Sequence, residues 1–187
     1  VRFFEREDVL HTEGSIDPKR DIALFEEILI NEDLTAVNER ITRVETELKK
    51  GRKENQKEFD VLTKCRATLE NKKPLRTLGL SLDEEKLIRG FKYLSLKPIV
   101  RVVNSGEEKK QPDIEKLKNE LSKCIPFYGR LELEMEELTD EALKADFLKD
   151  LGITLCGAEI FIKQIYDNTG LITFFTVGDE ITRGWAI

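Results

Sequence analysis

The residues of this chain that could do chemistry follow an apolar run near its middle. Pro98 opens the run, which covers 99–103 and stops at the polar segment from Asn104 to Glu107. β-Branched residues bounded by Pro and Gly predict a strand buried on both faces, as in a parallel α/β sheet. Open α/β sheets bind ligands at the carboxyl ends of their strands. An amide and a carboxylate at this place can hydrogen-bond to a nucleotide base.

Asn104 gives the more specific signal of the two. A side-chain amide can donate to adenine and accept from it at once, as amides do in DNA grooves. The alternative is an ordinary turn formed by Asn104, Ser105 and Gly106, and spacing alone favours that turn.

Other kinds of site find little support in the sequence. His11 is the only histidine, and no Cys, Asp or Glu stands near it at ligand spacing, so no metal site is expected. His11 is interpreted as a polar residue at the exit of a strand. No Ser or Cys pairs with a base, so no catalytic residue is assigned. The phosphate-binding pattern Gly-x-x-x-x-Gly-Lys-Ser/Thr does not occur.

A second candidate site is a basic cluster around Gly51, formed by Lys49, Lys50, Arg52 and Lys53. The segment 38–73 carries eleven Lys and Arg against seven acids, although the whole chain has a net charge of -6. A basic segment in an acidic protein points to an anionic partner. Contact with RNA phosphates and a merely solvated turn are equally weighted interpretations.

The elements that must position this cluster are two helices with heptad-like seams. Apolar residues recur three and four apart on both sides of Gly51: Leu34, Val37, Ile41, Val44 and Leu48 before it, and Phe59, Leu62, Cys65 and Leu69 after it. This spacing predicts an antiparallel helical hairpin, or coiled coil, whose arms are roughly 20–30 Å long at ~1.5 Å per residue. Because each narrow seam buries little except against the other, we expect the hairpin to be thin.

Further signals place the remaining elements. Asp17 before Pro18 predicts a helix start, and Ser81 with Glu84 forms a capping box at another. Strands are predicted over 1–4, 125–128, 171–177 and 181–187, and helices from Pro112, in the second half of 131–150, and over 157–166. Both ends of the chain lie in predicted strands, so we expect an excerpt of a longer protein.

Composition sets outer bounds on class and compartment. Apolar residues make up 40% of the 187 residues and charged residues 36%, which indicates a core with long exposed helices. Three Cys in apolar surroundings indicate a reducing compartment, so a cytoplasmic location is expected. No apolar run approaches the ~18 residues of a membrane helix, and no membrane partner is expected.

Six co-linear strings resemble the YchF/EngD group, the Obg-like ATPases among the translation-factor P-loop NTPases. The matching segments are Val1–Glu5 with His11, Ile16–Ile22, Lys73–Arg76, Gly90–Pro98, Phe147–Gly152, and Gly170–Gly178 with Arg183 and Trp185. The resemblance implies an α/β fold: the rear part of a P-loop G domain, an inserted helical hairpin and the start of a β-rich TGS domain. The implied boundaries are 1–21 and 73–166 for the G domain, 22–72 for the hairpin and 167–187 for the TGS start.

The resemblance also implies a nucleotide site. The family reads its base with Asn-x-x-Glu and prefers ATP over GTP; Asn104 and Glu107 match that motif, with Ser105 at a usually apolar position. A later loop, usually Ser/Cys-Ala-Lys, aligns with Tyr128 and Gly129. Mg²⁺ is expected in a full-length protein, with ligands outside this chain, and the protein is expected to be a monomer.

Three hypotheses remain open at this stage. In the first, the chain is part of an Obg-like ATPase associated with ribosomes and is inactive alone. In the second, it is a non-catalytic module that binds ribosomes or ribosomal RNA through the basic tip. In the third, it is a divergent homologue with no nucleotide site.

Overall fold

The computed structural model describes residues 1–105, 124–138, 140–150, 157–178 and 181–187. They belong to two compact units: unit 1 is made of Val1–Lys19 with Ile99–Ile187, and unit 2 of Arg20–Pro98. Glu107 and the helix predicted from Pro112 lie outside the described residues.

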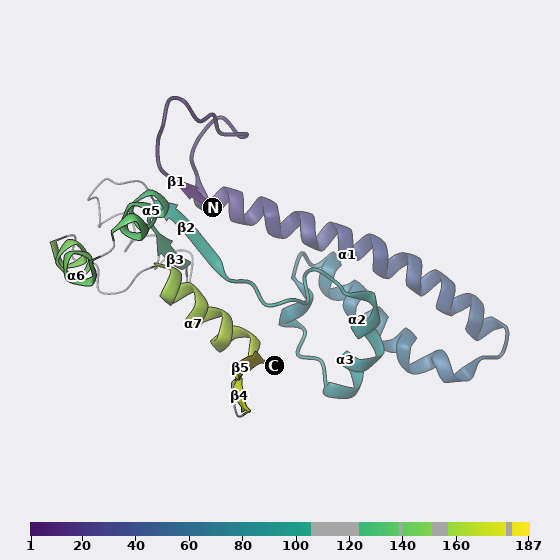
Figure 1. The fold of residues 1–187 in the computed structure, drawn as a ribbon. Coiled ribbons are helices and arrows are strands. Elements are labelled where there is room, and N and C mark those ends of the chain that lie inside the picture. The colour runs from purple at the N-terminus through teal and green to yellow at the C-terminus, as the bar shows by residue number, and fades with distance from the viewer. Residues whose placement is uncertain (106–123, 139, 151–156, 179–180) are drawn as a thin grey trace. The chain divides into compact units, whose positions relative to one another are not determined.

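Unit 1 contains a parallel three-stranded sheet with the strand order β1-β2-β3, where β1 is Arg2–Phe3, β2 is Arg101–Ser105 and β3 is Cys124–Phe127 (Figure 1). The predicted α/β class is therefore confirmed, and β2 is the central strand of this sheet. The prediction that this strand is buried on both faces is wrong, because only Val103 and Ser105 of β2 are buried. The strand also starts later than the apolar run, since its pairing with β3 begins at Arg101.

Helices and a β-hairpin complete the described part of unit 1. The elements are α5 (Gly129–Glu137), α6 (Glu141–Asp150), α7 (Gly157–Thr169), β4 (Thr173–Val177) and β5 (Thr182–Ala186). The acidic segment is thus helical in its first half as well as its second. Helix α7 ends before Gly170, whose φ of 68° is the left-handed conformation that a helix stop requires. Strands β4 and β5 pair antiparallel as a two-stranded sheet.

Unit 2 is built on the predicted helical hairpin. Helix α1 (Pro18–Lys49) starts at the predicted proline and is 32 residues long, hence about 48 Å. It turns at Gly51, which has a φ of 88°, and passes through a 3-10 turn (Lys53–Asn55) into α2 (Gln56–Glu70). Helix α3 (Leu82–Ile88) follows, with both hydrogen bonds of the predicted capping box present.

The core of unit 2 extends beyond the hairpin seam. Residues Val37, Ile41 and Val44 of α1 pack with the buried face of α2, as the heptad spacing predicts. Residues from the segment after α2 join the same core: Leu75, Ile88 and Tyr93. The expectation of a thin hairpin is therefore wrong, because 75–96 packs against the base of the two helices. The sequence spacing missed this because the packing partners are not periodic.

A buried polar network ties this segment to α1. The Asp33 carboxylate is only 3% exposed and accepts hydrogen bonds from the backbone N–H groups of Leu94 and Ser95, at 2.8 and 2.6 Å. The Ser95 hydroxyl in turn accepts from the Leu75 N–H at 3.2 Å. Since buried backbone donors need partners, these contacts let an irregular segment pack against a helix.

Candidate functional site

The carboxyl ends of the parallel strands bring most of the predicted base-site residues together. In the sheet register, Asn104 of β2 lies between Arg2 of β1 and Phe127 of β3. Tyr128 and Gly129 follow β3 directly, so they stand beside Asn104 at the same edge of the sheet. This edge is where open α/β sheets bind ligands.

Asn104 is held in one orientation by the backbone of α5. Its Oδ1 accepts a hydrogen bond from the Gly129 N–H at 3.1 Å. Because an N–H group can only donate, the contact identifies the oxygen of the amide. The amide nitrogen Nδ2 makes no hydrogen bond to any described residue. One half of the bidentate pairing predicted for the amide is therefore already used within the protein.

Gly129 allows this approach because it lacks a side chain. A β-carbon at this position would lie 3.2 Å from Asn104 Oδ1 and 3.4 Å from Nδ2. The 3.2 Å contact is tighter than ordinary van der Waals contact, so the amide would have to shift by a few tenths of an ångström. The absence of a side chain at Gly129, the first residue of α5, thus explains how its N–H can approach Asn104.

Ser105 and Tyr128, the other two predicted site residues at this edge, lie in different surroundings. Successive side chains of a strand point to opposite faces, so Ser105 does not share the face of Asn104. Its hydroxyl is buried and has no partner among the described residues. Tyr128 is half-buried at the start of α5, and burial raises the pKa of its phenol above the ordinary value. The phenol stays neutral at physiological pH, and its hydroxyl can donate and accept hydrogen bonds.

A contact that the sequence did not suggest joins α5 to α7. The carboxylate of Glu132 accepts hydrogen bonds from Gly157 N–H and, at 3.3 Å, from Ala158 N–H. These are the first N–H groups of α7, which have no acceptor within their own helix. This contact had no signal in the sequence, because Glu132 lies in an acidic run and its spacing does not distinguish it from solvated neighbours.

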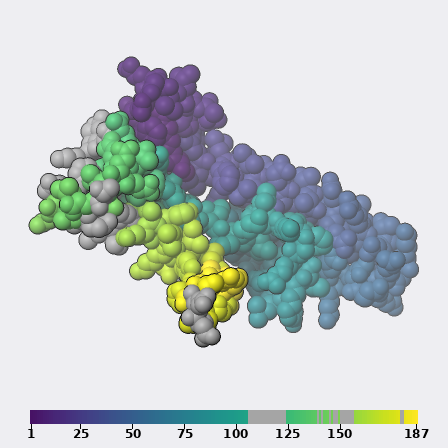
Figure 2. Space-filling view, in the orientation of Figure 1, coloured from purple at the N-terminus to yellow at the C-terminus, as the bar shows by residue number. Residues whose placement is uncertain are grey.

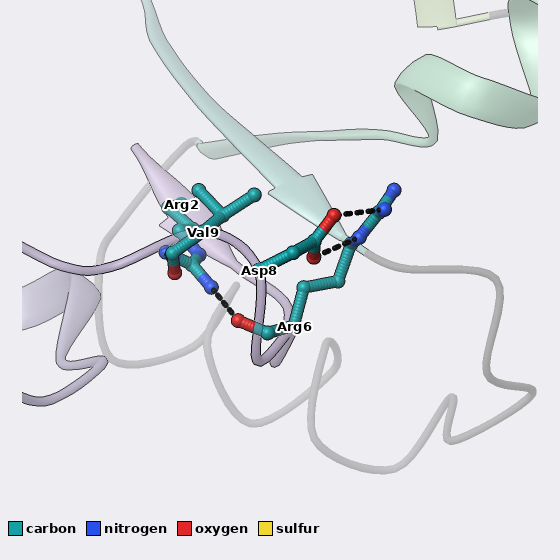
Figure 3. Close-up of polar contacts among 4 residues, drawn as sticks. All are labelled: Arg2, Arg6, Asp8 and Val9. Carbon is teal, nitrogen blue, oxygen red and sulfur yellow. Dashed lines mark hydrogen bonds and ion pairs between the residues drawn. The ribbon is translucent and has the colours of Figure 1, made fainter.

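The loop that follows β1 is organised by arginine. The Arg2 guanidinium donates to the backbone oxygens of Phe4 and Val9, at 2.9 and 2.7 Å, and to that of Arg6 at 3.4 Å, and it lies 4.7 Å from the Phe4 ring centre. Arg6 forms a two-point pair with Asp8, which lowers the pKa of that carboxyl (Figure 3). Both arginines are therefore engaged in folding the loop.

His11 lies in a turn beyond this loop. Its Nδ1 accepts from Glu13 N–H at 3.1 Å, and its backbone oxygen accepts from Gly14 N–H. These local contacts are typical of a residue that shapes a turn.

The basic tip lies at the far end of unit 2. Lys49, Lys50, Arg52 and Lys53 are all exposed. On the face that the space-filling view shows, the end of the hairpin lies uncovered (Figure 2). Arg52 approaches Glu47 at 3.9 Å, whereas the three lysines form no ion pair with any described residue. Three of the four cations of the tip therefore have no acidic partner among the described residues.

Two negative findings concern the described residues alone. They contain no group of three or more His, Cys, Asp or Glu side chains that could hold a metal ion. Among the same residues, no helix combines the length and the apolar character needed to cross a membrane.

No family model matches the chain, but individual proteins match it in sequence and in structure. The ribosome-binding ATPase YchF of Haemophilus ducreyi is 34% identical over 193 residues, which cover 100% of this chain and 53% of that protein. The Bacillus subtilis protein of the same name is 34% identical over 194 residues, with 99% and 53% covered. The Schizosaccharomyces pombe YchF GTPase structure matches with a TM-score of 0.79 and 26% identity, covering 100% of this chain and 53% of that one.

The chain thus spans about half the length of the curated relatives it matches. The chain covers the same share of the YchF GTPase structure, so the sequence matches and the structural match span the same fraction of the other protein. The resemblance seen in the sequence is confirmed: in sequence and in fold, this chain is similar to YchF proteins over about half of their length.

Proposed function

We propose that this chain supplies base recognition to an Obg-like ATPase that prefers ATP over GTP. The observation that carries the proposal is the Asn104–Gly129 hydrogen bond, which leaves the Asn104 amide nitrogen available at a sheet edge suited to ligands. Relatives that match the whole chain are named ribosome-binding ATPases, which supports a nucleotide as the ligand.

The two polar residues of the motif have separate roles in this proposal. The Nδ2 of Asn104 donates to purine N7, an acceptor that adenine and guanine share. Asn104 therefore gives affinity for purines in general. The preference for ATP is assigned to Glu107, whose carboxylate accepts from the adenine amino group and repels the guanine oxygen at the same position.

Phosphate and Mg²⁺ binding are assigned to other parts of a full-length protein. The chain has no phosphate-loop pattern, and its described residues do not fit a metal site. Phosphoryl transfer depends mostly on phosphate positioning and charge neutralisation. The chain alone is expected to bind ATP with millimolar affinity at best, ~ -4 kcal/mol, and not to hydrolyse it.

The test is the substitution Asn104→Ala in the full-length protein. Losing one hydrogen bond of about 1–1.5 kcal/mol raises the Kd for ATP and for GTP by about tenfold, as measured by calorimetry. Asn38→Ala, an exposed position on α1, is the matched control and leaves both constants unchanged. Unchanged ATP affinity in Asn104→Ala would refute the base-reading role.

Glu107→Gln tests the second role in the same assay. We expect it to narrow the difference between ATP and GTP, because the neutral amide can also donate to the guanine oxygen. An unaltered ratio of the two dissociation constants would assign the preference for ATP elsewhere.

A second candidate function rests on the tip lysines. We propose that Lys49, Lys50, Arg52 and Lys53 contact ribosomal RNA, since three of them are exposed cations without an ion pair among the described residues. Phosphate contacts by lysine and arginine are electrostatic and weaken as salt rises. The names of the relatives support a ribosomal partner.

Co-sedimentation with ribosomes tests this function. Replacing all four tip residues by Glu reduces the bound fraction, most strongly at low salt. The control makes the same charge change at exposed positions elsewhere in unit 2: Lys73, Lys86, Arg89 and Lys97. If both variants lose binding equally, net charge and not the tip is responsible.

A further inference from the structure

Glu132 connects α7 to the residues that hold the proposed base-reading amide. Its two carboxylate oxygens accept from the N–H groups of Gly157 and Ala158 at the start of α7. A carboxylate satisfies these donors well, because the amino end of a helix carries partial positive charge. The side chain of Glu132 is half-buried.

Close packing surrounds this contact. A β-carbon at Gly157 would lie 2.6 Å from a carbon of the Phe127 ring and still closer to Glu132 Oε1, so no larger residue fits there. A β-carbon at Gly129 would lie 3.5 Å from another carbon of the same ring. Phe127 therefore packs against the start of α5 and against the start of α7. A shift of one helix would move the Phe127 ring against the other helix.

The first turn of α5 links Glu132 to Asn104. The Glu132 backbone N–H donates to the Tyr128 oxygen at 2.9 Å, which closes that turn. The turn presents the Gly129 N–H, which in turn donates to Asn104 Oδ1. A continuous series of hydrogen bonds thus runs from the amino end of α7 to the amide.

We infer that Glu132 is a positioning residue for base recognition: by anchoring α5 to α7 it holds the Gly129 N–H against Asn104. The inference rests on the proposed function of Asn104. Without the anchor, the turn can move away and the Asn104 amide is free to rotate. An amide that exchanges its oxygen and nitrogen presents the wrong group to purine N7, so affinity for the base falls.

The test compares ligands with and without a base, in the full-length protein. Glu132→Gln keeps the shape of the side chain but replaces one accepting oxygen by a donor, which opposes an N–H of α7. We expect the Kd for ATP to rise about tenfold and the Kd for inorganic tripolyphosphate to stay within about twofold. Glu134→Gln is the matched control: this glutamate is on the same helix but pairs with Arg130 at 3.0 Å, and both constants should stay unchanged.

A double-mutant cycle separates positioning from simple stabilisation. In an Asn104→Ala background, Glu132→Gln should have no further effect on ATP affinity, because the amide through which it acts is gone. Additive effects, or equal weakening of ATP and tripolyphosphate, would overturn the inference. Glu132→Asp, which retains both accepting oxygens, should fall between wild type and Glu132→Gln for ATP, and a loss equal to that of Glu132→Gln would also count against it.

The cycle also distinguishes the two proposals. If Asn104→Ala weakens ATP binding but Glu132→Gln does not, the positioning role is wrong and the proposed function stands. If Asn104→Ala itself leaves ATP binding unchanged, both are wrong.

Discussion

Asp33→Asn should loosen the segment that packs against the hairpin base. The carboxylate is 3% exposed and accepts from two backbone N–H groups, those of Leu94 and Ser95. In the asparagine variant one oxygen becomes an NH₂ group, which cannot accept. One buried N–H is left without a partner, at about 1–3 kcal/mol, and the remaining bond loses its charge assistance, at about 1 kcal/mol.

These terms together give a cost of about 3 kcal/mol, which is roughly a hundredfold change in a local opening equilibrium. Native-state amide hydrogen exchange measures that equilibrium residue by residue. We expect protection of the Leu94 and Ser95 amides to fall by about this factor in Asp33→Asn. The Leu75 amide should lose protection too, because its acceptor is the Ser95 hydroxyl.

The matched control is Glu32→Gln, an exposed acid next to Asp33 on the same helix. It makes the same chemical change without a buried partner, so protection at these amides should match that of the wild type. Unchanged exchange in Asp33→Asn, or an equal loss in Glu32→Gln, would refute the assigned role of the carboxylate.

Three further predictions concern unit 2. Leu62→Ala, at a fully buried seam position, should lower the free energy of unfolding in urea by about 2–5 kcal/mol, whereas Leu82→Ala, at 77% exposure, should change it little. Hydrogen bonds, first from Lys64 and then from the α3 cap, lower the pKa of Glu84 from 4.5 to about 2. Its contribution to stability is therefore complete above pH 4.5 and is lost as pH falls toward 2, so the difference in Tm between wild type and Glu84→Gln should shrink over that range. Lys92 has a φ of 54°, and Lys92→Gly should raise Tm. Relief of the left-handed strain is worth about 1–2 kcal/mol, which exceeds the cost of about 0.4–1 kcal/mol from the added freedom of the unfolded chain. A lower Tm would contradict this.

Local signals in the sequence predicted the elements well. Asp17 with Pro18 and the Ser81–Glu84 box determine helix starts through contacts within a few residues, so they were visible in the sequence. The heptad spacing likewise identified the seam that Val37 and Val44 bury. Such signals depend on short-range geometry and do not need the rest of the fold.

Contacts between distant residues could not be predicted in the same way. The hydrogen bond from Gly129 to Asn104 depends on the register of β2 with β3, which periodicity does not determine. Asp33 stood on an apolar face of α1, a hint of a buried charge, but its acceptor role requires backbone donors 61 and 62 residues away. Glu132 carried no such hint, since its partners lie in another helix.

The buried Asp33 contact also bears on the order in which the chain folds. Pairing β1 with β2 brings Val1 to Val102, across a sequence separation of 101 residues. The contact of Asp33 with Ser95 closes 62 of them within unit 2. Because the entropy of loop closure grows as the logarithm of loop length, the shorter remaining loop costs about 1 kcal/mol less to close. The helical unit is therefore expected to form before β1 pairs with β2, since it separates these two strands in the sequence. Strand β3, which follows β2 closely in the sequence, can pair with it earlier.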